Sequence, residues 1–205
     1  MIVDYYFAPI SGYAYLSHAA FLDLARDVGA AIRYRPVEIG RVFAASGTTP
    51  PAAQSEARRT YRTEDQARIA AERGLAIAGQ PAHWPTDARP ACRAIVAAGR
   101  VGADQGQAAF ACLRAVWAED RDIADARQLG EALAAAGLPA AGIVAEADTP
   151  EVHAEAERLT DEAIAAGVFG SPTYVVAGER FWGQDRLPAL RRRLSVSARA
   201  PEPQA

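Results

Sequence analysis

Residues 168–185 read VFGSPTYVVAGERFWGQD and combine a tight turn, a proline and two short apolar runs. The Gly-Ser-Pro turn leads into an apolar run over 173–176, and a break at Gly178 is followed by a second short apolar run over 181–182. This pattern predicts a β-hairpin. Pro172 cannot donate to a sheet ladder and therefore belongs at a strand start or on an edge. A proline at that place is also a candidate for a cis peptide bond.

The N-terminal segment is expected to fold back beside this hairpin. Residues 2–7 are rich in β-branched and aromatic side chains and predict a buried strand. A helix is expected to begin at Ser11 and to close near Gly29. Residues 32–37 alternate apolar and basic side chains and predict a second strand. The strand-helix-strand order implies a right-handed crossover and a parallel pair of strands.

The middle of the chain has mainly helical patterns. Helices are expected over about 54–73, from Pro90 to Gly99, over 105–118, 124–136 and 149–166, and from Asp185 to about Leu194. The order of elements predicts an α/β thioredoxin-like fold (βαβ…ββα) with a large all-helical insertion. The expected divisions are residues 1–45 and 166–195 for the two halves of the thioredoxin-like domain, 46–165 for the helical insertion, and 196–205 for a flexible tail.

The composition excludes several classes of function. The chain has 205 residues and a net charge of −3, which gives no reason to expect binding to nucleic acid or to an anionic membrane. All 22 basic residues are arginines, so neither Schiff-base catalysis nor a Walker phosphate loop is available, because both need lysine. No apolar run approaches the about 18 residues of a membrane span, and the N-terminus lacks the basic region of a signal peptide.

The two cysteines, Cys92 and Cys112, form no metal-ligand spacing with the three histidines, so no metal site is expected. A cytoplasmic, reducing compartment is the expectation, with a disulfide between them weighted at roughly one in ten.

Ser11 occupies the place where a thioredoxin fold carries its reactive group, the N-terminus of the first helix opposite the proline-preceded strand. Neither end of the segment 11–14 is a cysteine, so the chain cannot run a dithiol–disulfide cycle from these side chains. Ser11 can cap the helix, and it can also donate its hydroxyl to a thiolate supplied by a ligand. The free N–H groups and partial positive charge of a helix N-terminus lower the pKa of a bound thiol. No motif places a His and an Asp around Ser11, so a serine-hydrolase triad is not expected.

Both ends of the chain resemble the 2-hydroxychromene-2-carboxylate isomerases, which are relatives of kappa-class glutathione transferases within the thioredoxin-like disulfide oxidoreductases. The similar segments are IVDYYFAPISGYAYL at residues 2–16, VFGSPTY at 168–174 and FWGQDRL at 181–187. Between them, residues in the family's order are Tyr61, Asp65, Arg68, Gly74 and the Trp84-Pro85 pair. The resemblance covers about residues 1–194.

The resemblance implies glutathione as cofactor. Ser11 matches the family serine that faces the glutathione sulfur and would be catalytic. Ser171 matches the residue before the cis-proline, Pro172, and its main chain would pair with the cysteinyl backbone of glutathione. The segment matched to the γ-glutamyl end consists of Trp182, Gly183, Gln184 and Asp185. The Asp185 carboxylate can meet the γ-glutamyl ammonium or simply cap the last helix, and the two roles are compatible.

The activity implied is reversible addition of the glutathione thiolate to a conjugated ring-opened or hemiketal carboxylate, rotation about the bond made single, and elimination. The substrate would be a small aromatic carboxylate from aromatic catabolism. A homodimer is a further expectation.

Several acceptor-side positions depart from the family pattern. Gly12 stands where the family has proline, which loosens the first helical turn. Ala44 stands where some isomerases have a basic residue, and Thr48 or Thr49 replaces an asparagine.

Three residues of the loop and helix start at 84–93 are candidates for substrate binding. Arg89 or Arg93 can bind a substrate carboxylate, or both can be solvated arginines at a helix start. Trp84 can stack on an aromatic acceptor or pack against the helical insertion.

Two further hypotheses use the same surface. A kappa-like glutathione transferase would conjugate electrophiles, and would accumulate conjugate stoichiometrically. A noncatalytic module would bind thiols or extended peptides beside the cis-proline, without needing glutathione.

Overall fold

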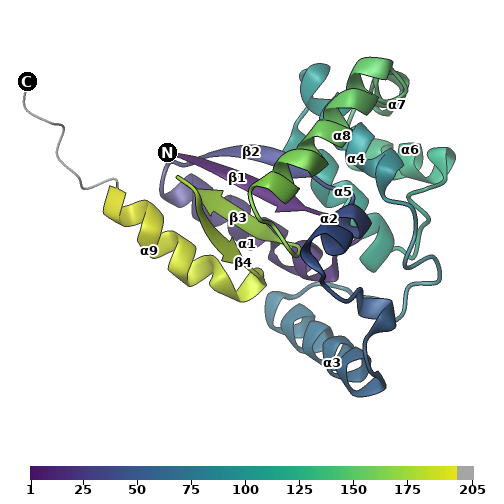
Figure 1. The fold of residues 1–205 in the computed structure, drawn as a ribbon. Helices are drawn as coiled ribbons and strands as arrows, with labels where there is room; N and C mark the ends of the chain where they lie inside the picture. The colour runs from purple at the N-terminus through teal and green to yellow at the C-terminus, as the bar shows by residue number, and fades with distance from the viewer. Residues whose placement is uncertain (198–205) are drawn as a thin grey trace, which may run out of the picture.

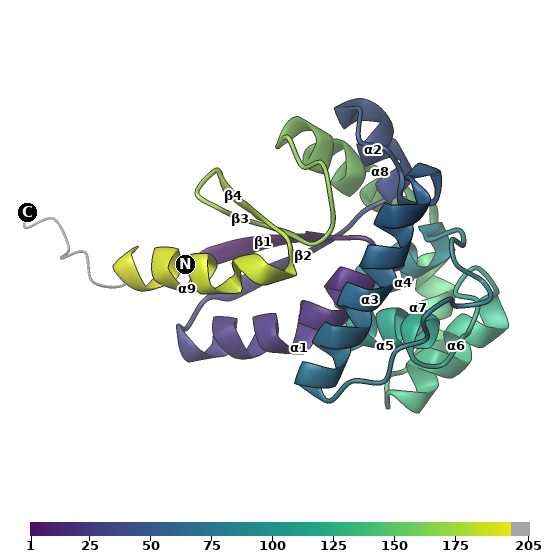
Figure 2. The same cartoon turned by 90° about the horizontal axis from the view of Figure 1, so that it is seen from below.

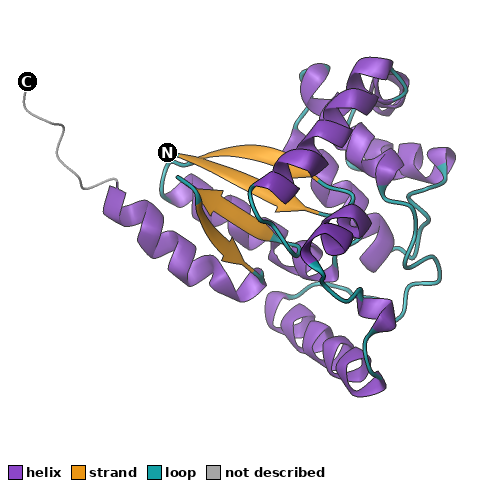
Figure 3. Ribbon diagram, viewed as in Figure 1, coloured by secondary structure: helices purple, strands orange, loops and turns teal. Residues whose placement is uncertain are grey.

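A four-stranded sheet formed from both ends of the chain organises the molecule (Figures 1 and 3). The computed structural model describes residues 1–197. The strands lie in the order β2-β1-β3-β4, where β1 is Ile2–Phe7, β2 is Ala31–Pro36, β3 is Thr173–Val176 and β4 is Glu179–Trp182. β1 pairs parallel to β2 and antiparallel to β3. The predicted crossover, hairpin and return of the C-terminal segment to β1 are therefore confirmed.

The two faces of the sheet are covered by different helices. Tyr5 and Tyr174 belong to a core cluster with α1 (Gly12–Asp27) and α9 (Leu187–Ser197), whereas Tyr6 and Val175 belong to a second cluster with α8 (Pro150–Ala165) and α2 (Ile39–Ser46). This division follows from the alternation of side chains along a strand. Figure 2 shows α1 on one side of the sheet and α8 with α2 on the other.

His18 lies in the aromatic core between α1 and the sheet. Its Nε2 lies 2.9 Å from the Gly106 carbonyl oxygen and its Nδ1 lies 3.3 Å from the Tyr5 hydroxyl. Burial lowers the pKa of His18 to about 4, partly offset by the hydrogen bond to Gly106. The imidazole is therefore neutral at pH 7.

The segment between β2 and β3 is helical, as predicted. Besides α2 and α8 it contains α3 (Glu56–Arg73), α4 (Arg89–Arg100), α5 (Gln105–Trp117), α6 (Ala126–Ala135) and α7 (Ala140–Ala147), with a 3-10 turn at Pro51–Ala53. The prediction had no helix at α2 or α7. The core cluster of α1 continues through α4, α5 and α6, so these helices share one apolar interior with the sheet.

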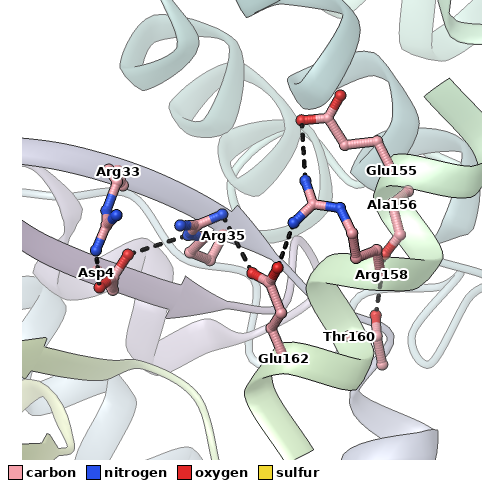
Figure 4. A network of polar contacts seen from close by, with 8 residues as sticks. All are labelled: Asp4, Arg33, Arg35, Glu155, Ala156, Arg158, Thr160 and Glu162. Carbon is pink, nitrogen blue, oxygen red and sulfur yellow. Dashed lines mark hydrogen bonds and ion pairs between the residues drawn. The ribbon is translucent and has the colours of Figure 1, made fainter. Parts of the chain in front are cut away.

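Ion pairs connect α8 to the first two strands (Figure 4). The Asp4 carboxylate of β1 accepts from Arg33 at 2.6 Å and from Arg35 at 3.1 Å. Arg35 Nη1 lies 3.4 Å from Glu162 of α8, and Glu162 in turn pairs with Arg158. The last helix of the helical segment is therefore linked electrostatically to the start of the chain.

The last helix differs from the prediction at both ends. It begins at Leu187 rather than Asp185, which lies in a 3-10 turn at Gln184–Arg186. Pro188 fits the first turn of a helix and matches this start. The helix continues to Ser197, so residues 196 and 197 of the expected tail are helical. The expected tail residues 198–205 lie outside the described residues.

The two cysteines and the length of the helices are further features of the fold. Cys92 and Cys112 are both buried and free, and burial raises the pKa of each thiol. Among residues 1–197, no helix combines the length and apolarity needed to cross a bilayer.

Candidate functional site

Ser11 caps α1 and reaches the hairpin entry. Its Oγ accepts a hydrogen bond from the Ala14 N–H at 3.2 Å and donates to the Ser171 carbonyl oxygen at 3.1 Å. The cap is possible because Ser11 has an extended backbone just before the helix. The structure confirms that Ser11 caps the N-terminus of α1, and its hydroxyl points to the segment before β3; donation to a ligand thiolate stays a prediction.

The Ser171–Pro172 peptide bond is cis, as expected for the proline at the hairpin entry. The Ser171 Oγ accepts from the Ala8 N–H at 2.9 Å, and the Pro172 carbonyl accepts from the Gly183 N–H at 2.9 Å. Within the described part of the chain, the Ser171 N–H has no hydrogen-bond partner. This leaves one main-chain donor beside Ser11 available to a ligand.

A cavity of about 860 Å³ opens over Ser11 and Ser171. This volume lies within the range of small-molecule binding sites. Its lining comes from well-separated parts of the sequence and is mainly apolar, including Ile10, Phe43, Pro51, Trp84, Trp117, Phe169 and Trp182.

Trp182 forms one wall of this cavity from the end of β4. Its ring centroid lies 4.7 Å from that of Phe169, and a Cβ on Gly170 would stand 2.3 Å from its Nε1. Gly170 is therefore required for Trp182 to lie against the backbone before Ser171.

The three residues after Trp182 do not line the cavity themselves. The Gln184 Oε1 accepts from Arg73 Nη2 at 2.6 Å, and the half-exposed Asp185 pairs with Arg186 at 3.1 Å. Gly183 has a φ of 108°, which turns the chain from β4 into this segment.

Trp84 both lines the cavity and supports the loop before Ser11. Its Nε1 donates to the Ile10 carbonyl at 2.9 Å, and the Trp117 Nε1 donates to the same oxygen at 3.2 Å. The two indole centroids are 5.7 Å apart. Of the two expected roles for Trp84, packing against the helical segment is therefore present, and one part of its surface remains open to the cavity.

Arg89 and Arg93, expected to bind a substrate carboxylate, are not brought together with Ser11. Both line a separate pocket of about 350 Å³ between α4 and α8. Arg89 pairs with Asp87 at 2.7 Å, and Arg93 Nη1 lies 3.4 Å from the His153 Nδ1. The start of α4 directs these side chains toward α8 and away from the cavity at Ser11, which fits the alternative of arginines at a helix start; binding of a substrate carboxylate by either stays a prediction.

Arg62 of α3 was missed. It lines the cavity at Ser11, with its guanidinium carbon 5.3 Å from the centroid of the Trp84 ring. The sequence contains a usable signal. Ile69 and Gln66 are buried on α3, and counting back in steps of three and four residues leads to Arg62 on the same helix face.

Tyr13 also lines the cavity and donates to the Asp65 carboxylate at 3.0 Å. Burial, followed by the hydrogen bond to Asp65, raises the pKa of Tyr13 well above its usual value. Tyr13 is therefore a neutral phenol at physiological pH.

Comparison with known proteins places the chain in a family. Residues 2–195 match the model of the DSBA-like thioredoxin domain. A 2-hydroxychromene-2-carboxylate isomerase from Sphingobium xenophagum is 30% identical over 190 residues, which span 92% of this chain and 95% of the relative. The chain belongs to the 2-hydroxychromene-2-carboxylate isomerase family.

Other members and structures agree with this assignment. The isomerase of that name from Pseudomonas putida is 29% identical, with 91% of each chain covered. A solved 2-hydroxychromene-2-carboxylate isomerase superposes with a TM-score of 0.79 at 26% identity, covering 97% of both chains. A probable DsbA oxidoreductase from Streptomyces coelicolor also reaches a TM-score of 0.79, at 20% identity and over 100% and 93% of the two chains, and shares the fold.

The positions that depart from the isomerase family pattern have distinct surroundings. Gly12 is buried, and a Cβ there would stand 2.4 Å from the Gln66 Nε2 and 3.0 Å from the Trp117 ring. Ala44 is exposed on α2 and does not line the cavity, whereas its neighbour Phe43 does. Thr48 lines the cavity and donates to the Phe169 carbonyl at 3.2 Å.

Proposed function

We propose that the chain is a glutathione-dependent isomerase of the 2-hydroxychromene-2-carboxylate isomerase type, with Ser11 as its catalytic residue. The observation that carries the proposal is the 3.1 Å hydrogen bond from Ser11 Oγ to the Ser171 carbonyl at the inner end of an 860 Å³ cavity. Membership of the isomerase family supports the reaction type and an aromatic carboxylate as substrate.

The residues around Ser11 fit the cysteinyl part of glutathione. An extended peptide beside Ser171 would donate to its carbonyl oxygen and accept from its unpartnered N–H, a short β-type pairing. When the Ser171 carbonyl accepts from the ligand, the Ser11 hydroxyl can rotate and donate to the sulfur instead. The N-terminus of α1 adds a favourable potential for an anion at that point.

The segment after Trp182 is the proposed place for the γ-glutamyl end. Asp185 is half-exposed and its pairing is with the neighbouring Arg186, so its carboxylate is accessible to an ammonium group. Gln184 is held by Arg73, which fixes the main chain of this turn.

Glutathione would supply a thiolate that adds to the conjugated substrate and leaves again after bond rotation, with no net oxidation or reduction. The chain's own contribution is to hold that sulfur ionised under Ser11 and the α1 N-terminus. The neutral Tyr13 phenol can donate to an oxygen of the substrate once it is released from Asp65.

Two further parts of the proposal concern the cell and the assembly. Two free buried cysteines suit a reducing cytoplasm, where glutathione is available. That the chain binds no nucleic acid and that it forms a homodimer both stay predictions. Sedimentation velocity would measure the oligomeric state.

The test is a spectroscopic assay with 2-hydroxychromene-2-carboxylate. Wild type should form the ring-opened benzylidenepyruvate only when glutathione is added, and Ser11→Ala should lose roughly 100-fold in turnover, as expected for loss of one donor to developing charge. Ser195→Ala, an exposed serine on α9, is the matched control and should keep full activity.

Three outcomes would count against the proposal. They are turnover without glutathione, equal activity of Ser11→Ala and wild type, and no turnover by the pure enzyme. Stoichiometric accumulation of a glutathione conjugate would favour the transferase hypothesis instead.

A further inference from the structure

We propose that Arg62 binds the carboxylate of the acceptor substrate and so selects aromatic acids over their uncharged analogues. The proposal rests on the proposed function, since it assigns the acceptor half of the same cavity. Its ligand class is a flat aromatic ring that carries a carboxylate.

The Arg62 side chain is partly buried, and among the described residues its guanidinium has no hydrogen-bond or ion-pair partner. Its Nη1 is inaccessible to solvent and donates no hydrogen bond to any described residue, while the side chain as a whole lines the cavity. By contrast Arg68, further along the same helix, pairs with Asp65 at 3.0 Å. A desolvated donor left unpaired is costly, so an anion that meets the guanidinium from the cavity side would offset part of this cost.

The obvious internal partner for Arg62 is engaged elsewhere. Asp65 lies one turn along α3, but its two carboxylate oxygens accept from the Tyr13 hydroxyl and from Arg68. Burial lowers the pKa of Arg62, while Tyr13 acts in the opposite direction and Arg59 in the same direction. A ligand anion would therefore relieve an electrostatic cost that the chain itself does not relieve.

Trp84 holds Arg62 close to the reaction centre. The guanidinium carbon lies 5.3 Å from the Trp84 ring centroid, a cation–π distance. Trp84 is fixed by its hydrogen bond to the Ile10 carbonyl, and Ile10 directly precedes Ser11. The positive charge and the proposed thiolate position thus face the same cavity. The Trp84 indole contacts Arg62 on one side and the residue before Ser11 on the other.

Other charges lining the cavity are less suited to this role. Asp87 and Glu38 would repel a carboxylate, and Asp87 is already neutralised by Arg89. Arg58 is exposed, so water competes for any anion that it meets. Arg62, by contrast, already has one nitrogen that is shielded from water. It also lies beside apolar cavity walls that suit an aromatic ring.

The test compares binding of chromone-2-carboxylate and chromone-2-carboxamide, measured by calorimetry in the absence of glutathione. Wild type should bind the acid roughly 10- to 100-fold more tightly than the amide, as expected for a charge-assisted hydrogen bond. Arg62→Gln should bind both equally. Arg59→Gln, an exposed arginine on α3 outside the cavity lining, makes the same change in net charge and should keep the preference.

The thermal midpoint of Arg62→Gln should stay close to that of wild type, because the partly desolvated, unpaired charge and its contact with Trp84 are lost together. That readout separates a binding defect from misfolding. Glutathione affinity of Arg62→Gln should be unchanged.

The proposal is overturned if wild type binds acid and amide equally, if it binds neither, or if Arg62→Gln keeps the preference for the acid. A selective loss of glutathione affinity in Arg62→Gln would also overturn it, by assigning the charge to a glutathione carboxylate. Failure of the isomerase proposal appears separately, as an absence of glutathione-dependent turnover by wild type.

Discussion

A single hydroxyl, that of Ser11, connects the two ends of the chain at the site. It accepts from its own helix and donates across to Ser171, so its proton already points to where a ligand backbone would compete for the same carbonyl. Under the proposed function, a ligand backbone that donates to the Ser171 carbonyl would share this acceptor with Ser11, and the Ser11 hydroxyl could then turn to the ligand sulfur.

His18 makes the stability of the molecule depend on pH. The His18 imidazole has the ordinary pKa of 6.5 in the unfolded chain, and burial lowers this pKa to about 4 in the folded chain. As the pH falls below 6.5 the unfolded state gains a proton that the folded state does not, so the free energy of unfolding should fall by on the order of 2 to 3 kcal/mol by pH 4. Urea unfolding at pH 7, 6, 5 and 4 measures this slope.

His18→Gln should flatten that slope, because the titrating group is gone. His83→Gln removes an exposed histidine and serves as the control, which should keep the wild-type slope. Equal slopes in wild type and His18→Gln would contradict the assignment.

At single residues, sequence reasoning identified groups whose position depends on local structure. Ser11 and Pro172 lie next to turns and helix starts, and the structure confirms the N-cap and the cis bond. The sequence did not show that Arg62, rather than Arg89 or Arg93, lines the cavity at Ser11, because the orientation of an arginine depends on which distant surface packs against its helix. Here Trp84 of a separate loop covers Arg62, and α8 faces Arg93.

At the scale of elements, the first turn of α1 is built around the absence of a side chain at Gly12. A Cβ there would meet the Gln66 amide at 2.4 Å and the rigid Trp117 ring at 3.0 Å. Gly12→Ala should therefore lower the free energy of unfolding by about 1–3 kcal/mol through overpacking. Chemical denaturation measures the change.

Gly142→Ala on α7 is the matched control, since nothing lies within 4 Å of its added Cβ, and it should be neutral or slightly stabilising. Gly12→Ala combined with Gln66→Ala should show coupling, because the shortened side chain removes the closest contact. Additive losses in the double variant would argue against the clash with Gln66.

Elements bounded by proline, glycine or a capping residue were predictable from the sequence, and elements without such residues at their ends were not. The hairpin has a proline before β3 and Ala177-Gly178 at its turn, both with positive φ. α8 has Thr149 as N-cap and Pro150 in its first turn. α2 and α7 are short, have no side-chain cap, contain a glycine and bury one residue each, Val42 and Ile143. Tertiary packing, rather than a local signal, defines them.

At the scale of the whole molecule, Asp4 is the centre of the ion pairs that link β1, β2 and α8 (Figure 4). The side chains of Asp4 and Arg35 are 16% and 17% exposed, so this pair is less screened than a surface pair. Asp4→Asn should lower the free energy of unfolding by about 1 kcal/mol at low salt, and by less at 1 M salt.

Asp23→Asn removes a pair whose side chains are 74% and 63% exposed, and its effect should be close to zero. If Asp4→Asn is destabilised equally at low salt and at 1 M salt, Asp4 acts through packing. If it is not destabilised at all, the ion pairs of Asp4 do not contribute to stability.

The strand order β2-β1-β3-β4 has a consequence for the order of synthesis. Ser11 and Ser171 are 160 residues apart, so nearly the whole polypeptide must leave the ribosome before the two halves of the site can meet. Until then β1 has only β2 as a partner, and its other edge is open. A product truncated before Thr173 would lack the third strand and would expose that edge to other chains, so the pairing that builds the site also protects the nascent protein from association.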